Sequence, residues 1–239
     1  MNVSSSFMVG MKLKDKDIAD LKYMTNLTYI NLCDNNLKDV SVLGSIPTLQ
    51  NIQIHNNNIS DISFVKELNN LDCVAAQNNN MSDLSPLKGK TKITQLWLAE
   101  NPITDISAIS GLTNMKSAGF NWCKLKSLDP LKKMTKLETL CLQGTGVKDL
   151  SALKNCKNLK YLYLGSCNVS DVSPLAGSEG FVELYLDGNP IDEDSISTFK
   201  GITVTGYIDL RNTGLTRDQF NRIYMLLFSN NDSFTYSYS

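Results

Sequence analysis

The sequence lacks the features that mark membrane-spanning and nucleic-acid-binding chains. No apolar run approaches the roughly 18 residues that a membrane-spanning helix requires. Lys and Arg number 23 against 24 Asp and Glu, which gives a formal charge of -1. A chain without excess positive charge has no general attraction to nucleic acid or to an anionic membrane. We therefore predict neither nucleic-acid binding nor membrane insertion.

Signals for export and for phosphate chemistry are also missing. The first residues, MNVSSSFMVGMKLKDKD, contain no basic segment followed by an apolar core, which is the arrangement of a secretory signal peptide. There is no Gly-rich phosphate-binding loop. These residues therefore predict no signal peptide, and the sequence predicts no nucleotide site.

The sequence does contain an internal repeat of 22 residues. The pattern is L-x-x-L-x-L-x-x-N-x-I-x-D-I-S-x-L-x-x-L-x-x, and its first position is apolar eight times in succession: Leu27, Leu49, Leu71, Ile93, Met115, Leu137, Leu159 and Phe181. A ninth, irregular unit follows near Val204, and a partial unit precedes Leu27. A constant period of this length predicts a solenoid of stacked repeats.

Each position of the repeat predicts a local structure. Positions 4 and 6 are apolar and alternate with other residues, so they are the inward residues of a short parallel strand. Position 9 is usually Asn, whose amide can satisfy backbone groups where the chain leaves the sheet. Asp at position 13 and Ser at position 15 are N-cap residue types, and Pro86, Pro130 and Pro174 follow three position-15 residues. The unit is therefore a strand, a corner and a short helical or 3-10 turn.

The ends of the solenoid need caps that cover its last core layers. We assign residues 1–26 to an N-terminal cap and partial repeat, 27–215 to nine repeats, and 216–239 to a C-terminal capping helix and tail. Thr216 and Gln219 form a predicted capping box, and an apolar face beginning at Phe220 follows. A membrane-binding helix is the alternative. For the tail FTYSYS, a short strand and disorder both remain open.

The repeat resembles the 22-residue leucine-rich repeat of the internalin type. The segments ISDIS at Ile59–Ser63, ITDIS at Ile103–Ser107 and VSDVSPL at Val169–Leu175 carry the resemblance, which extends from about Asp17 to Leu215. It implies a curved α/β solenoid, with a parallel sheet on the concave face that binds another protein, usually outside a bacterial cell. Similar repeats occur in the intracellular regulatory subunits of protein phosphatase 1, so the resemblance leaves the location open.

Aromatic residues gather at positions predicted to face outward from the concave sheet. Trp and Tyr give large contact areas with a polar tip and are enriched at protein interfaces. We predict a non-catalytic module that binds a protein or peptide through eight residues: Trp97, Trp122, Tyr161, Tyr163, Tyr185, Tyr207, Glu183 and Asp187. Two alternatives are packing of these rings for stability alone, and a structural or self-associating domain of a larger bacterial cell-surface protein.

Residues suited to catalysis or metal binding are sparse. Cys33 and the single histidine, His55, occupy position 7 of adjacent units and could form a nucleophilic pair. No third residue completes such a site, so we predict no enzyme, no cofactor and no metal site. The six cysteines are spread over distant positions, and unpaired thiols favour a reducing compartment or an anaerobic habitat. We expect a monomer, and cell-surface and cytoplasmic locations both remain open.

Overall fold

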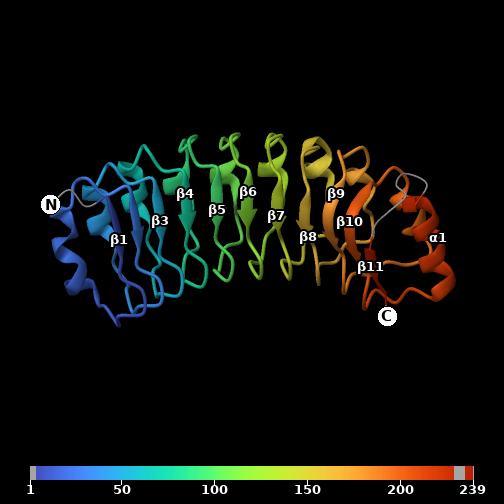
Figure 1. Cartoon of the computed structure of the whole chain (residues 1–239), viewed down its shortest axis with the longest axis horizontal. Helices are drawn as coiled ribbons and strands as arrows, with labels where there is room; N and C mark the ends of the chain where they lie inside the picture. Colours follow the sequence, from blue (N-terminus) through green and yellow to red (C-terminus); the bar gives the residue numbers. More distant parts are fainter. Residues whose placement is uncertain (1–3, 229–234, 239) are drawn as a thin grey trace.

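The computed structural model describes residues 4–228 and 235–238. The chain forms an elongated, curved solenoid (Figure 1). Within these residues, one parallel sheet of eleven strands runs along the solenoid in chain order from β1 to β11. Figure 1 shows the strands side by side, with the chain colours advancing steadily from the N-terminal to the C-terminal end. This order confirms the predicted α/β leucine-rich-repeat architecture.

The strands are short, and all but two have three residues. They are β1 (Ser5–Phe7), β2 (Tyr29–Asn31), β3 (Asn51–Gln53), β4 (Cys73–Ala75), β5 (Gln95–Trp97), β6 (Ser117–Gly119), β7 (Thr139–Cys141), β8 (Tyr161–Tyr163), β9 (Phe181–Tyr185), β10 (Val204–Asp209) and β11 (Thr235–Ser237).

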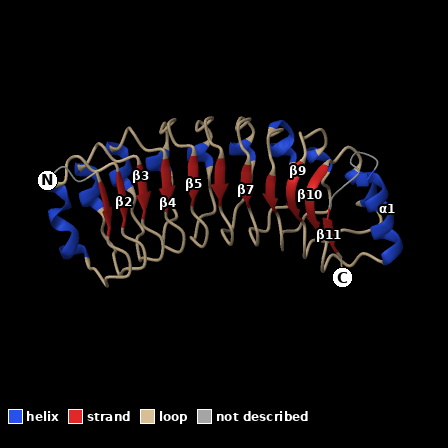
Figure 2. Cartoon of the chain, viewed as in Figure 1, coloured by secondary structure: helices blue, strands red, loops and turns tan. Residues whose placement is uncertain are grey.

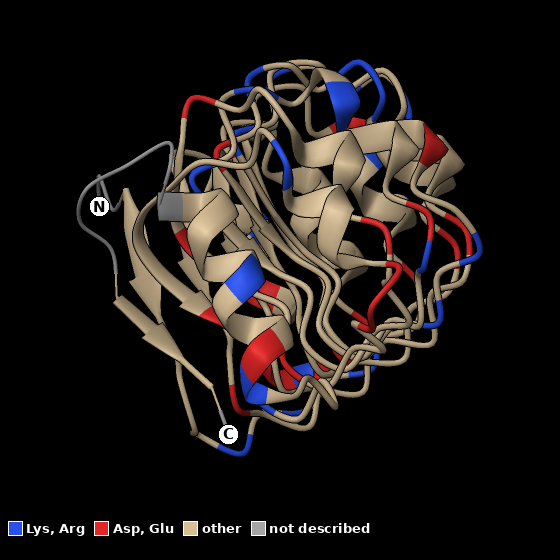
Figure 3. Cartoon of the chain, turned by 90° about the vertical axis from the view of Figure 1, so that its right-hand side faces the viewer, with Lys and Arg blue, Asp and Glu red and all other residues tan. Residues whose placement is uncertain are grey.

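In the described part of the chain, the convex side carries nine 3-10 turns, and an α-helix covers the C-terminal end (Figure 2). The turns are η1 (Asp15–Tyr23), η2 (Ser41–Ser45), η3 (Ser63–Glu67), η4 (Ser85–Leu87), η5 (Ser107–Ile109), η6 (Asp129–Leu131), η7 (Ser151–Asn155), η8 (Ser173–Leu175) and η9 (Ile196–Phe199), and the helix is α1 (Arg217–Phe228). Figure 3 looks along the solenoid from this end and shows the sheet on one side and the turns on the other.

The register of the sheet follows the sequence period. From β2 to β9, each residue pairs with the residue 22 positions later, as in Ile52 with Val74 and Val74 with Leu96. The inward residues therefore stack into continuous apolar columns, and each of these three side chains is at most 2% exposed. Because outward positions follow the same register, residues at one repeat position also lie side by side on the surface.

The position-9 asparagines connect neighbouring repeats, as predicted. Asn57 is typical, because its Nδ2 donates to the Leu32 carbonyl of the preceding repeat at 3.0 Å and to the Ile54 carbonyl of its own at 3.1 Å. Its Oδ1 accepts the backbone N–H of Leu37 at 3.0 Å. Where Cys167 replaces Asn, its thiol donates to the Leu142 carbonyl at 3.1 Å and lies 3.5 Å from Thr145 Oγ1. The amide column thus satisfies buried backbone groups at the corner.

The turns η2 to η8 begin one residue earlier than the sequence pattern predicts, whereas in η9 Ser195 is the N-cap, as predicted. In η2 to η8 the first residue is the position-15 residue, as at Ser63 of η3 and Ser85 of η4. The capping oxygen belongs to the position-13 Asp: Asp61 accepts the Ser63 N–H at 2.7 Å and Asp83 accepts the Ser85 N–H at 2.8 Å. The serines therefore begin the turns, and the aspartates satisfy their first free N–H groups.

Both ends of the sheet extend beyond the nine strands expected from the repeats. At the N-terminal end, β1 pairs with β2 in a register of 24 residues, with Ser5 opposite Tyr29. At the C-terminal end, the tail forms β11 beside β10. This pairing settles the open alternative for residues 235–237 in favour of a strand.

The C-terminal helix has the predicted capping box. The backbone N–H of Thr216 donates to Gln219 Oε1 at 2.8 Å, and the N–H of Gln219 donates to Thr216 Oγ1 at 3.3 Å. Phe220 is buried against the last repeat and stacks on Tyr238 with ring centroids 4.5 Å apart. Among the described residues, no helix is long and apolar enough to cross a lipid bilayer.

Candidate functional site on the concave face

The strand register places the aromatic residues on the concave surface. Inward leucines flank Trp97 on β5, so its indole points away from the core and is partly exposed. Trp122 occupies the corner that follows β6 and is 53% exposed. Its φ of 64° is shared by the other position-8 residues, such as Asn56 at 56° and Glu100 at 57°. The left-handed corner is therefore a property of every repeat, and it directs the Trp122 ring outward.

Glycines in the following repeat make room for both indoles. A β-carbon added at Gly119 would lie 2.7 Å from Cε3 of Trp97, and one added at Gly144 would lie 2.2 Å from Cε3 of Trp122. Each ring therefore lies directly against the backbone of the next repeat. Any larger residue at these two glycines would push the ring away. The tryptophans are held by their neighbours and present one face to solvent.

Three of the four predicted tyrosines form one stack across adjacent strands. The Tyr163 and Tyr185 ring centroids are 5.0 Å apart with an interplanar angle of 23°, and those of Tyr185 and Tyr207 are 5.3 Å apart at 53°. The Tyr163 hydroxyl donates to Glu183 Oε2 at 2.6 Å. Tyr161 lies opposite Glu183 in the register of β8 and β9, outside the stack. We call Tyr163, Tyr185 and Tyr207 the tyrosine stack.

The pKa values of two hydroxyls in the stack, those of Tyr163 and Tyr185, are raised. Burial raises the pKa of Tyr163, and the bond to Glu183 and its charge raise it further. Burial also raises the pKa of Tyr185, with a smaller contribution from Glu183. Tyr163 and Tyr185 therefore offer neutral hydroxyl groups beside the Glu183 carboxylate.

An acidic group adjoins the tyrosine stack at the corner after β9 and β10. Asp209 is fully buried, and Arg211 binds both of its carboxylate oxygens through Nε and Nη2 at 2.6–3.1 Å. Burial alone would raise the pKa of Asp209, but the hydrogen bonds and charge of Arg211 lower it below its ordinary value. Asp187 lies against Gly165, and burial together with the Asp209 charge raises the pKa of Asp187. The site is thus a row of rings with a carboxylate border.

A further aromatic pair lies at the opposite end of the concave face. The Phe7 and Tyr29 rings are 4.9 Å apart, and Phe7 is 68% exposed. Sequence reasoning missed Phe7 because β1 departs from the 22-residue period. Aromatic rings therefore lie all along the concave face, at Tyr29, Trp97, Trp122 and the tyrosine stack. The carboxylates lie near its C-terminal end.

The geometry at Cys33 and His55 does not favour nucleophilic chemistry. Cys33 is 1% exposed, and burial raises the pKa of its thiol to about 11. A thiol of this kind is protonated at neutral pH and is a poor nucleophile. All six cysteines are free thiols. Within residues 4–228 and 235–238, no group of three or more His, Cys, Asp or Glu is arranged to hold a metal ion.

Comparisons with known proteins agree with this architecture. The family model for leucine-rich repeats in two copies matches residues 25–67 and 135–177. An internalin (inlF) from Listeria monocytogenes is 23% identical with a TM-score of 0.72, covering 99% of this chain and 82% of that one. Internalin C2 (inlC2) from the same organism is 26% identical with a TM-score of 0.66, covering 83% of each chain.

A third structure extends the likeness to another bacterium. A leucine-rich-repeat protein from Leptospira interrogans is 19% identical with a TM-score of 0.70, covering 86% of this chain and 54% of that one. The search of curated protein sequences gave no match. Repeat pattern, sheet order and structural neighbours lead to one assignment: the chain is a leucine-rich-repeat protein with internalin-like repeats.

Proposed function

We propose that the chain is a non-catalytic module that binds a protein or peptide on its concave face. The leucine-rich-repeat fold is a general scaffold for protein interaction. The tyrosine stack is the observation that carries the proposal for this particular face. Its rings are preorganised by mutual contact and by Glu183, so binding would cost little side-chain entropy.

The two tryptophans support the same surface. Because each ring lies against a glycine of the next repeat, it is positioned before any partner arrives. Exposed aromatic rings in fixed positions are typical anchors of an interface, and the surrounding polar groups exclude water and select the partner. In this proposal Tyr161 extends the ring surface, and Glu183 and Asp187 form the selective border.

A binding experiment with paired variants tests the proposal. The immobilised chain is used to capture proteins from bacterial and host-cell lysates, and the proteins retained are compared with those retained by a Trp97→Ala/Tyr185→Ala variant. The control is Tyr23→Ala/Met225→Ala, because these residues are 73% and 63% exposed but lie on η1 and α1 at the two ends of the solenoid. We expect a specific partner to be lost with the concave variant alone.

Two results would argue against the proposal. Identical captured sets for the wild type and the concave variant would mean that the rings serve packing only. A mass that rises with protein concentration, and falls back to the monomer in the concave variant, would instead support self-association through this face. Light scattering on the same three proteins separates these outcomes.

A further inference from the structure

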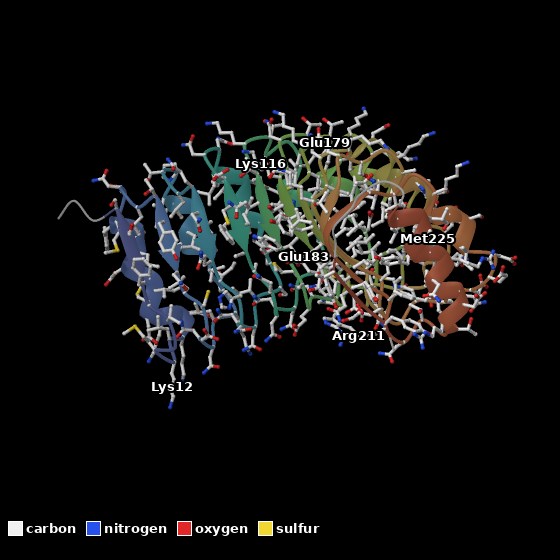
Figure 4. All side chains as sticks on the ribbon, turned by 45° about the vertical axis from the view of Figure 1, so that its right-hand side comes forward. Lys12, Lys116, Glu179, Glu183, Arg211 and Met225 are labelled. Atoms are coloured by element: carbon white, nitrogen blue, oxygen red, sulfur yellow. The ribbon has the colours of Figure 1, made fainter. Side chains whose placement is uncertain are left out.

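The edge of the solenoid at which β5 to β8 begin is strongly basic. The four segments that lead from the convex turns into these strands are residues 88–94, 110–116, 132–138 and 154–160. Together they contain ten lysines and one acidic residue, Glu138. We call these segments the lysine band. Figure 4 shows Lys116 at this edge, Glu183 on the sheet and Arg211 at the opposite edge, so Lys116 lies apart from the Glu183 carboxylate of the concave site.

The ammonium groups of the band donate hydrogen bonds mainly to neutral oxygens and rarely to carboxylates. Lys92 Nζ donates to Asn70 Oδ1 at 2.8 Å, and Lys136 Nζ donates to Asn114 Oδ1 at 2.7 Å. Asn114 is itself held, because its Nδ2 donates to the Thr91 carbonyl at 2.9 Å. Lysines tied to neutral acceptors are positioned without losing their charge. Among the described residues of the band, Lys132 is the lysine paired with a carboxylate.

Acidic residues gather along the other edge, where the strands end and the turns are capped. This edge carries the repeated position-13 aspartates: Asp39, Asp61, Asp83, Asp105, Asp149 and Asp171. The formal charge of -1 is a total over the whole chain, so it does not describe the local charge of either edge. A charged partner experiences the local potential at the edge that it approaches.

We propose that the lysine band is a second interaction surface, which binds an acidic segment of a partner polypeptide. Neighbouring repeats are about 4.8 Å apart, so the four repeats span roughly 15 Å, the length of about five residues of extended peptide. The band contains no aromatic residue and no arginine. Nucleic-acid bases therefore have no ring on which to stack, and phosphates have no bidentate partner. Point charges with interspersed Thr and Asn favour the carboxylates and backbone of a peptide.

The test uses a fluorescent peptide of about ten glutamates and measures its binding by anisotropy at low and at physiological salt. The band variant changes Lys92, Lys116, Lys136 and Lys160 to Gln. The control variant changes four exposed lysines of the opposite edge to Gln: Lys38, Lys124, Lys126 and Lys148. Both variants lose four positive charges, so any difference between them reports the location of the charge.

We expect the band variant to weaken binding about tenfold, because several exposed ion pairs each contribute modestly to it. The control variant should lose much less affinity for the peptide. Physiological salt should lower the affinity of the wild type to nearly that of the band variant. Equal losses in both variants would overturn the proposal, since net charge alone would then explain binding. A ten-nucleotide oligothymidylate that binds more tightly than the peptide, and is lost in the band variant, would also overturn it in favour of nucleic acid.

Discussion

Replacing Asn79 by alanine tests the amide column that links the repeats. The Asn79 side chain is 6% exposed and makes four hydrogen bonds. Its Oδ1 accepts the Ile59 N–H at 2.9 Å, and its Nδ2 donates to the carbonyls of Ile54, Ala76 and Gln77 at 3.0–3.2 Å. Alanine removes all four bonds and leaves the surrounding apolar columns unchanged.

The four lost bonds do not have equal weight. The Ile54 carbonyl keeps the Asn57 amide, the Ala76 carbonyl keeps the Asn101 amide, and the Gln77 carbonyl keeps a backbone N–H. Among the described residues, the Ile59 N–H has no second acceptor. It lies in the core, so leaving it unpaired contributes about 1–3 kcal/mol of the loss. With about 0.5 kcal/mol for each carbonyl, the unfolding free energy should fall by about 3 kcal/mol.

Thermal unfolding followed by far-UV circular dichroism measures this loss. For a chain of this length, about 3 kcal/mol corresponds to a Tm lowered by roughly 6–12 °C. Asn80→Ala is the matched control, because the neighbouring Asn80 side chain is exposed and its removal should change Tm very little. Equal shifts for the two variants would refute the reasoning, since the buried amide would then contribute no more than an exposed one.

Three further predictions concern charge, pH and thiol reactivity. Arg211→Ala leaves the Asp209 carboxylate buried without its cation, so Tm should fall, and adding Asp209→Asn should restore part of the loss; no recovery would contradict the pairing. The bonds from the Ser85 N–H and hydroxyl lower the pKa of Asp83 below 3.8, so this stabilisation exists above that pH and disappears as the pH falls further. In Asp83→Asn, Tm should therefore fall less steeply between about pH 5 and 3 than in the wild type. Burial raises the pKa of Cys33 to about 11, so iodoacetamide at pH 8 should label it slowly when folded and rapidly in urea; rapid labelling of the folded protein would contradict this burial.

The repeat made most of the fold predictable from the sequence. Inward positions 4 and 6 repeat the same packing requirement in every unit, so the core, the register and the convex turns follow from the period. The two end strands could not be predicted in this way. The pairing of Ser5 with Tyr29 spans 24 residues, and that of Tyr207 with Thr235 spans 28, so neither follows the 22-residue step. The register of these end strands is set by pairing with the edge strand of the sheet, and the repeat period does not set it.

The candidate site was predictable in position but not in geometry. The period places Trp97 and the tyrosines outward, but it does not say how neighbouring rings arrange themselves. The contact of Trp97 with Gly119, and the bond from Tyr163 to Glu183, depend on which residues share a column in adjacent repeats. The column composition was visible in the sequence, and the stack could have been suspected from it, but its angles and hydrogen bonds required the structure.

The lysine band shows why total charge is a weak guide for a solenoid. In a compact domain, residues of opposite charge from many loops mix over one surface. Here each repeat contributes its segments to fixed edges, so a lysine-rich stretch recurring across four repeats forms a continuous band. The concave rings and the band occupy different positions of the same unit, and variants at one should leave the other unchanged. A partner that contacts both surfaces would lose affinity in the ring variants and in the band variants. Two separate partners would each lose affinity in only one of these two sets.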